Sequence, residues 1–329
     1  MKILVRLPNW LGDMVMSVGF IDQLQRFYPD AEVSVIAKKG IHELLPFFPH
    51  IKHSFIFDKK DHPGMKGLWK FGKMIEKVQK FDLFFCLPES FSSAFMGYAT
   101  GAKKRIGYKK ELRNILLTHA YNKEEGLHRV EEYASLLRKF AAKPVSDINV
   151  SLQHQFERKD HVVVNINSEA SSRRLTNNKA VELLNLVRSS IANKIILIGA
   201  PKEREFVESV LQRLNDKKNI ESVAGETNLP QLIEVLATAK AMLTTDSGPA
   251  HLSNALGTST IVLFGAGNEN NTAPYIKELR KVIRLGELSC EPCTKNVCVL
   301  YGVPQCLERL NSQKITEELK EVIDEQRFF

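Results

Sequence analysis

The stretch that decides the fold is residues 242–265, MLTTDSGPAHLSNALGTSTIVLFG. It passes from an apolar run through the polar turn TTDSG into a helical run, and then into the β-branched run 259–264. This pattern predicts a strand, a turn, a helix and a second strand. In an open α/β sheet a ligand binds beyond the carboxyl ends of the strands, where the next helix offers backbone N–H groups. Asp246, Ser247 and Gly248 fall at that point.

Either Asp246 or Ser247 alone is most simply explained as a helix N-cap. The turn, however, combines them with Gly248, which permits close backbone approach, and with Pro249, which suits the first helical turn. His251 follows one turn later. A histidine there is often only a structural hydrogen-bonding residue. Together these groups indicate an anion-binding site at the start of the helix.

Length and composition predict a two-domain globular protein. A chain of 329 residues is long for one core, and 43% hydrophobic and 8% aromatic residues are ordinary values for a soluble protein. No run resembles a signal peptide or reaches ~20 apolar residues, so we expect a cytoplasmic protein. The net charge of +8 favours anionic partners: nucleic acid, a membrane face or a phosphorylated substrate. Nucleic acid is the weakest of these, because no zinc finger, helix-turn-helix or RNA-binding signature is present.

Strands and helices alternate in both halves of the chain. The first half predicts strands at 2–7, 32–37 and 81–87, and the second at 162–167 and 194–198. We therefore expect an α/β fold with two Rossmann-like domains whose parallel sheets face each other across a cleft. The polar segment 143–160 suggests domains at 1–155 and 156–312, with a C-terminal helix at about 313–329 that could pack back on the first domain.

Asp13 is the candidate catalytic carboxylate of the N-terminal half. It follows the first predicted strand in the turn PNWLGD, where GxGxxG is missing, so the sequence does not indicate a dinucleotide site. One interpretation is an N-cap or a first-turn acid. The other is a carboxylate directed into a cleft, available as a general base.

A basic cluster in the N-terminal half is a candidate acceptor site. Such clusters are usually solvated faces, but with interleaved aromatic residues they could meet an anionic acceptor or a membrane face, where each cation contributes about 1 kcal/mol. The cluster consists of Lys103, Lys104, Arg105, Lys109 and Arg113.

Four of the five cysteines are spaced as C-x₂-C-x₄-C-x₇-C, at Cys290, Cys293, Cys298 and Cys306. In a cytosolic protein this spacing could indicate a structural zinc site, although a second CxxC pair is absent. The alternatives are reduced buried thiols or a disulfide.

Three separated motifs resemble one known family. They are ILVRLPNWLGDMVM at 3–16, TTDSGPAH at 244–251 and CEPCTKNVCVLYGVPQCLERL at 290–310. Together they resemble the ADP-heptose:lipopolysaccharide heptosyltransferases, glycosyltransferase family 9, and most closely the heptosyltransferase II group. The resemblance implies a GT-B fold, with the acceptor on the N-terminal domain and the nucleotide-sugar mainly on the C-terminal one. It also implies metal-independent, inverting transfer of heptose from ADP-heptose to the lipopolysaccharide inner core at the cytoplasmic face of the inner membrane.

The same resemblance implies roles for individual residues. Asp13 corresponds to the general base, and Arg173 to a lysine of a K-x-W-P motif that meets the diphosphate. Other positions correspond to donor-binding residues: Ser168 and Glu169 to a hydroxyl pair, Glu203 to a ribose-binding acid, Thr227 to a residue against adenine, and Asp246, Ser247, Gly248 and His251 to the phosphate and sugar loop.

Two departures from the family pattern keep other functions open. Arg173 is followed by Arg174-Leu175-Thr176 in place of Trp-Pro, and Glu169 introduces a carboxylate that repels a diphosphate unless an arginine pairs with it. The alternatives are a family member with another nucleotide sugar or acceptor glycan, or an inactive nucleotide-sugar-binding partner protein. No Asp-x-Asp metal motif is present, which is consistent with stabilisation of the leaving group by protein cations and dipoles.

Overall fold

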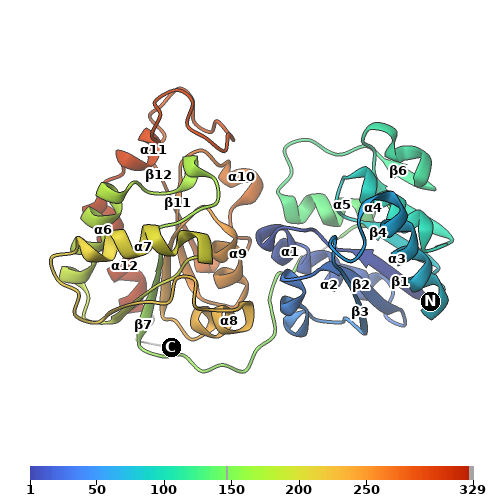
Figure 1. Ribbon diagram of the computed structural model, residues 1–329, viewed down its shortest axis with the longest axis horizontal. Coiled ribbons are helices and arrows are strands. Elements are labelled where there is room, and N and C mark those ends of the chain that lie inside the picture. Colours follow the sequence, from blue (N-terminus) through green and yellow to red (C-terminus); the bar gives the residue numbers. More distant parts are fainter. Residues whose placement is uncertain (146, 326–329) are drawn as a thin grey trace. The chain divides into compact units, whose positions relative to one another are not determined.

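The computed structural model describes residues 1–145 and 147–325. The chain divides into two compact units, Met1–Gln153 and His154–Phe329. Figure 1 shows the sheet and helices of each unit, coloured along the sequence. Among the described residues, no helix has the length and apolar content required to cross a membrane.

The N-terminal unit is built on a parallel sheet in the order β3-β2-β1-β4-β5-β6. This is the doubly wound order in which the chain reverses direction between β1 and β4. The last four of the five residues of β1 are buried, as expected for a strand covered on both faces. The strands are β1 (Lys2–Arg6), β2 (Glu32–Lys38), β3 (His53–Phe57), β4 (Leu83–Cys86), β5 (Lys104–Tyr108) and β6 (His119–Tyr121).

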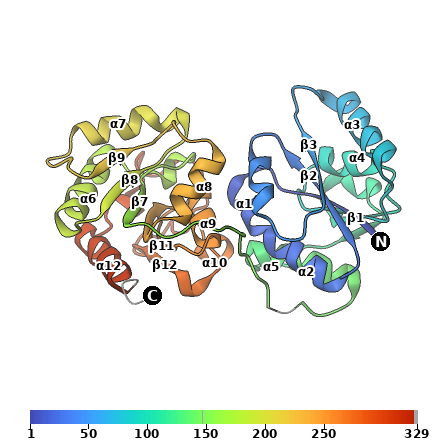
Figure 2. The same cartoon turned by 90° about the horizontal axis from the view of Figure 1, so that it is seen from below.

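Helices cover both faces of this sheet. Figure 2 shows α2 and α5 side by side on one face and α3 with α4 on the other. α3 buries Leu68, Phe71 and Ile75, and its Gly72 allows close approach to α4, since a Cβ there would lie 2.4 Å from the Cβ of Ala99. The helices are α1 (Leu11–Met16), α2 (Val18–Phe27), α3 (Gly64–Val78), α4 (Phe91–Ala99) and α5 (Arg129–Ala141), with 3₁₀ helices η1 (Ile41–Phe47) and η2 (Glu111–Leu116).

The C-terminal unit repeats the same strand order. Its parallel sheet runs β12-β11-β10-β7-β8-β9, so the chain reverses direction between β7 and β10. The strands are β7 (His161–Asn165), β8 (Lys194–Leu197), β9 (Ile220–Ser222), β10 (Ala241–Thr245), β11 (Ser259–Phe264) and β12 (Arg280–Arg284). The prediction of an α/β fold with two parallel sheets is confirmed.

The helices of this unit follow the strands in alternation. They are α6 (Asn177–Ser190), α7 (Arg204–Gln212), α8 (Leu229–Ala237), α9 (Gly248–Ala255), α10 (Glu269–Thr272), α11 (Gln305–Glu308) and α12 (Ser312–Glu325), with 3₁₀ helices η3 (Ser171–Arg173), η4 (Pro201–Glu203) and η5 (Lys277–Leu279).

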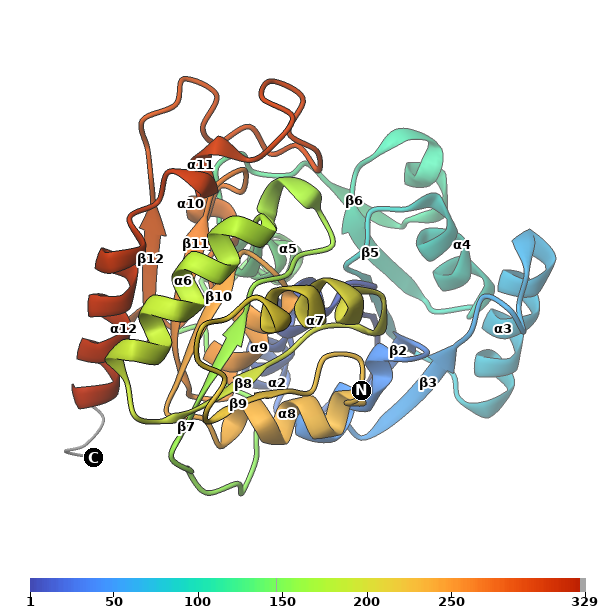
Figure 3. The same cartoon turned by 60° about the vertical axis from the view of Figure 1, so that its left-hand side comes forward.

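The C-terminal helix belongs to the core of its own unit. Figure 3 shows α12 beside α6. Ile315, Leu319 and Ile323 recur at helical spacing and are fully buried in the C-terminal core. The sequence analysis left open that this helix packs back on the first domain, whereas in the structure its apolar face packs on α6. Residues 326–329 of the expected helix lie outside the described residues.

Candidate active site

The turn between β10 and α9 stands at the sheet's switch point, as the sequence predicts. Ser247 occupies the N-cap position of α9 in extended conformation. Its hydroxyl donates to the Thr245 carbonyl (3.1 Å) and accepts from Asn165 Nδ2 (2.9 Å), both outside the helix. The N-terminal end of α9, with Gly248 first and the buried His251 one turn on, therefore keeps its positive dipole end directed out of the sheet edge.

Asp246 forms an ion pair with Arg173. The Oδ2 of Asp246 lies 3.2 Å from a terminal guanidinium nitrogen of Arg173, and the Asp246 side chain is 5% exposed, that of Arg173 27%. Burial raises the pKa of Asp246 above its usual value, and the charges of Arg173 and Arg284 oppose that shift. The structure therefore brings together two residues that are 73 positions apart in the sequence, and it leaves a cation at the mouth of the site.

The loop after β7 is tied to the turn after β10. Ser168 Oγ donates to the carbonyl of Asp246 (3.3 Å), which places this predicted residue in the site. Asn165 Nδ2 donates to Thr244 Oγ1 (3.1 Å), and Thr245 donates to the carbonyl of Asn167. The sequence analysis missed Asn165 and Asn167. A polar residue inside the otherwise apolar run VVVNIN was the available signal.

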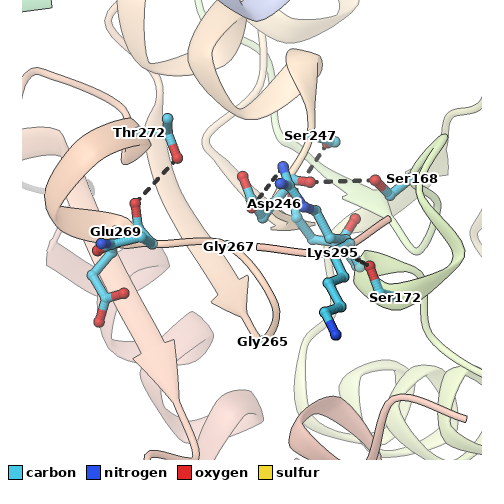
Figure 4. A network of polar contacts seen from close by, with 12 residues as sticks. Ser168, Ser172, Asp246, Ser247, Gly265, Gly267, Glu269, Thr272 and Lys295 are labelled. Carbon is cyan, nitrogen blue, oxygen red and sulfur yellow. Dashed lines mark hydrogen bonds and ion pairs between the residues drawn. The ribbon is translucent and has the colours of Figure 1, made fainter. Parts of the chain in front are cut away.

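A third missed residue, Arg284, holds the loop that covers Asp246. Its guanidinium donates to the carbonyl oxygens of Gly265 (2.8 Å) and Gly267 and forms a bidentate pair with Glu269 (2.8 and 2.6 Å). This fork geometry suits arginine and not lysine. A Cβ at Gly267 would lie 2.0 Å from Asp246 Oδ2, so only glycine fits there without moving the carboxylate. Figure 4 shows Gly265, Gly267 and Glu269 next to Asp246.

The cysteine-bearing loop braces the segment that carries Arg173. The buried Ser172 donates its hydroxyl to the Lys295 carbonyl (2.5 Å), and its backbone N–H donates to the Asn296 carbonyl (3.2 Å). The N–H of Thr294 donates to Ala266 (2.7 Å), which links the same loop to the Gly265–Gly267 turn. In Figure 4 Lys295 and Ser172 lie beside Asp246 and Ser168. The loop therefore fixes the positions of both partners of the ion pair.

The four clustered cysteines line one small cavity as free thiols. Within residues 1–145 and 147–325, no three His, Cys, Asp or Glu side chains are grouped so that they could hold a metal ion. Burial raises the pKa of Cys306 to about 11, and Glu291 adds to this shift. The described thiols are therefore not arranged to hold zinc, and the zinc interpretation of Cys290, Cys293, Cys298 and Cys306 gains no support from the structure.

The remaining predicted donor residues lie after the strands β7, β8 and β9. Glu169 is exposed and pairs with Lys202 Nζ at 3.0 Å, so its charge is compensated. Glu203 is buried, and its Oε2 accepts from the Ala200 N–H (2.7 Å), which stabilises its own turn. Thr227 is half-buried and precedes α8, whose N-cap is Asn228.

Asp13 lies in the first turn of α1, directly after the carboxyl end of β1. Trp10 takes the N-cap position, so the simple N-cap interpretation of Asp13 does not apply. The Asp13 carboxylate is half-buried and lies 3.7 Å from Arg129 Nε of α5. Burial raises the pKa of Asp13, and Arg129 opposes the shift. A half-buried carboxylate with a raised pKa at a strand end has the properties of a general base.

The structure does not gather the five predicted acceptor residues into one cavity. Arg113 is fully buried and donates to the Pro88 carbonyl (2.8 Å), and Arg105 donates to Leu116 and Ala102. Lys103 pairs with Asp82 at 2.7 Å, at the opposite, N-terminal end of β5. Lys104 lies over the Phe140 ring, and Lys109 is exposed after β5.

A cavity of about 1000 Å³ lies instead at the carboxyl ends of β1, β2 and β3. It is large enough for a drug-sized or larger ligand. Its lining combines cations with the serines at the start of α4. The polar lining residues are Arg6, Asn9, Lys38, Lys39, Asp58, Lys59, Lys60, His62, Ser90, Ser92 and Ser93. The sequence did not reveal this cavity, because its cations come from three separate segments, at the ends of β1, β2 and β3.

Comparisons with known proteins identify the family. The family model described as glycosyltransferase family 9 (heptosyltransferase) matches residues 68–303. Lipopolysaccharide heptosyltransferase 2 of Escherichia coli strain K12 is 27% identical over 352 aligned residues, which cover 98% of this chain and 99% of that protein. Lipooligosaccharide heptosyltransferase 2 of Campylobacter jejuni serotype O:2 is 25% identical, with 98% of each chain covered.

The solved structure of ADP-heptose LPS heptosyltransferase II from Escherichia coli superimposes with a TM-score of 0.84 at 25% identity, covering 99% of this chain and 100% of that one. The two doubly wound units are thus those of the GT-B fold. With a family model matched over most of its length, this chain belongs to glycosyltransferase family 9, the heptosyltransferases.

Proposed function

We propose that the protein transfers heptose from ADP-heptose to the inner core of lipopolysaccharide. Family membership and the names of the full-length relatives support the reaction class. The observation that carries the proposal is the Arg173–Asp246 pair at the N-terminal end of α9. It joins a cation and a helix dipole end at the place where a doubly wound sheet binds a nucleotide.

In this proposal the donor diphosphate binds the start of α9 at Ser247 and Gly248. Arg173, 27% exposed, supplies a forked cation for the phosphate oxygens, while Asp246 holds the guanidinium in place from behind. Lys202 neutralises Glu169, which removes the repulsion that this carboxylate would otherwise exert on the diphosphate. The departing ADP is then stabilised by fixed protein charges, the most effective kind of transition-state stabilisation.

The nucleoside end of the donor is assigned to the loops after β8 and β9. Glu203 uses Oε2 for its own turn, and its other oxygen, Oε1, is the one proposed to accept from a ribose hydroxyl. Thr227 is proposed to lie against the adenine before α8. His251, buried in the first turn of α9, is proposed to contact the phosphate or sugar.

Asp13 is proposed as the general base. Inverting transfer is a single displacement at the anomeric carbon through an oxocarbenium-like state, and it requires a base for the acceptor hydroxyl. The support is the position of Asp13 at the end of β1 and its raised pKa, which brings the carboxylate nearer the pH at which it must accept a proton.

The acceptor is assigned to the N-terminal unit and the donor to the C-terminal unit. The cavity at the ends of β1–β3 supports this assignment, because Lys38, Lys59 and Lys60 provide cations for an anionic, lipopolysaccharide-like acceptor. This replaces the cluster at Lys103–Arg113 as the proposed acceptor site. A lipid-linked acceptor further implies that the protein works as a peripheral protein at the cytoplasmic face of the inner membrane.

The test is ADP release from ADP-heptose, with a delipidated inner-core oligosaccharide as acceptor and EDTA present. ADP-glucose and UDP-sugars serve as competing donors. We expect Asp13→Asn to lower kcat by about 10²–10⁴-fold with donor affinity kept, and the exposed, matched control Asp30→Asn to retain activity. Near-normal turnover by Asp13→Asn removes Asp13 from the role of base. If another nucleotide sugar is turned over faster than ADP-heptose, that sugar replaces ADP-heptose as the proposed donor. Donor binding without any turnover favours the inactive partner protein.

A further inference from the structure

Nearly all the excess positive charge of the chain lies in one segment of the N-terminal unit. Residues 64–116 contain eleven Lys and Arg against four Asp and Glu, a net charge of +7, where the whole chain has +8. The segment comprises α3, β4, α4, β5 and η2. The positive potential is therefore local to this segment and is not spread over the whole protein.

The outer face of α3 combines these cations with exposed apolar side chains. Lys66, Lys70 and Lys77 recur at helical spacing and are exposed, and Trp69 between them is 40% exposed. Lys73 Nζ lies 4.9 Å from the centre of the Trp69 ring and 2.7 Å from Glu76. The exposed apolar residues that flank this stripe are Met65, Met74 and Val78.

Two neighbouring elements continue the same kind of surface. α4 packs beside α3, where the Tyr98 and Trp69 rings lie 6.1 Å apart. η2 packs on α4 through Leu116 and Leu117, which form a cluster with Ala94. On its other side Leu112 and Ile115 are 75% and 78% exposed, which is unusual for large aliphatic side chains in a folded protein.

We propose that the α3–α4–η2 surface docks the protein on an anionic lipid bilayer. The surface is defined by Met65, Lys66, Trp69, Lys70, Met74, Lys77, Val78, Tyr98, Leu112 and Ile115. Such a surface has the elements of interfacial binding. Its lysines attract lipid phosphates, the rings of Trp69 and Tyr98 suit headgroup depth, and Leu112 and Ile115 suit the boundary of the acyl chains. Glu76 is neutralised by Lys73, and Glu111 is the other acid on α3, α4 and η2.

The surface also borders the cavity assigned to the acceptor. Gly64, Met65 and Leu68 of α3 line one wall, and Ser90, Ser92 and Ser93 at the start of α4 line another. A glycolipid whose acyl chains remain in the bilayer could therefore present its anionic sugar to Lys59 and Lys60. This link to the acceptor rests on the proposed function, whereas membrane docking by itself does not.

The test is co-sedimentation of the full chain with vesicles of phosphatidylethanolamine and phosphatidylglycerol (3:1), beside vesicles of phosphatidylcholine, at physiological salt. We expect binding to the anionic vesicles only. Lys70→Gln with Lys77→Gln should weaken binding to the anionic vesicles about 25-fold, because each cation contributes about fivefold. Leu112→Ser with Ile115→Ser should weaken it at least about tenfold. The matched control, Lys217→Gln with Lys218→Gln on an exposed loop of the other unit, should bind normally.

Several results would overturn the docking surface. Wild-type protein that stays in the supernatant excludes it. Binding of both surface variants that matches that of the wild type also excludes it, as does a loss of binding in the Lys217/Lys218 control as large as that of the surface variants. A dimer in sedimentation equilibrium that is broken by Leu112→Ser with Ile115→Ser would assign the surface to a second copy of the chain. All variants should retain ADP release with the delipidated acceptor. If no donor supports ADP release while vesicle binding follows the expected pattern, the proposed function fails and the docking surface stands.

Discussion

Removing the cation from the Arg173–Asp246 pair tests the electrostatics of the site directly. Arg173→Met keeps most of the side-chain length and leaves the Asp246 carboxylate, which is 5% exposed, without its partner at 3.2 Å. Breaking a buried pair typically costs about 3–5 kcal/mol. Arg173 is 27% exposed and therefore partly screened by water, so we expect the lower end, about 2–3 kcal/mol at pH 7.

Protonation of Asp246 sets a ceiling on this cost, and the ceiling depends on pH. A carboxyl of ordinary pKa 3.8 takes up a proton at pH 7 for about 4 kcal/mol, and at pH 5 for about 2 kcal/mol. Burial raises the folded-state pKa of Asp246, so its contribution favours the folded state at low pH and is lost as the pH rises towards that pKa. The destabilisation by Arg173→Met should therefore shrink to about 2 kcal/mol or less at pH 5.

The assay is urea unfolding at pH 5, 6 and 7, followed by tryptophan emission and by far-ultraviolet circular dichroism. Both tryptophans, Trp10 and Trp69, lie in the N-terminal unit, so a change seen by circular dichroism alone reports on the C-terminal unit. The matched control is Arg204→Met, which breaks an exposed pair with Glu226 in the same unit and should cost at most about 1 kcal/mol.

The double variant Arg173→Met with Asp246→Asn should recover much of the lost stability and should lose the pH dependence, because no buried charge remains. The reasoning is refuted if Arg173→Met unfolds with the wild-type free energy at pH 7, or if its deficit grows on acidification. Either result means that Arg173 does not compensate the Asp246 charge.

Three further changes probe the surroundings of the site. Gly267→Ala places a Cβ against the Asp246 carboxylate and should cost about 1–3 kcal/mol and weaken ADP binding, measured by calorimetry; unchanged binding contradicts the close fit. Ser172→Ala removes the 2.5 Å bond to the Lys295 carbonyl and should cost about 1–2 kcal/mol in unfolding experiments, with ADP binding weakened too. In the pH profile of kcat/KM, activity should rise with pH as Asp13 loses its proton. Arg129→Met should move that acid limb to higher pH, because Arg129 lowers the pKa of Asp13; an unmoved limb argues against Asp13 as base.

The sequence predicted those parts of the fold that depend on the local periodicity of apolar and polar residues. The β10–α9–β11 unit is predicted from one stretch, because strand, turn and helix signals lie within 24 residues. Asp246 and Ser168 were placed correctly at strand ends, since parallel strands share one carboxyl edge. The zinc interpretation gained no support because spacing along the chain does not fix how the side chains are grouped in space.

Long-range partners explain what the sequence could not give. Arg284 bonds two glycine carbonyls nearly twenty residues away, and nothing in its local sequence distinguishes it from the neighbouring basic residues of β12. Arg113 looked like a member of an exposed basic cluster, yet it is fully buried against the Pro88 carbonyl. Burial of a charged side chain depends on tertiary packing, which charge patterning cannot report.

The repeated strand order accounts for the position of both proposed sites. In each unit the first strand, β1 or β7, is the neighbour of the strand at which the winding reverses, β4 or β10. Loops on either side of that point diverge and leave a crevice. Asp13 follows β1, and Ser168 and Asp246 follow β7 and β10, so each proposed functional group stands at its own unit's crevice. Arg173 only has to reach this crevice, because the crevice is set by the topology of the sheet. The discriminating chemistry, the sugar and the acceptor, must then come from the loops that the topology leaves free to vary.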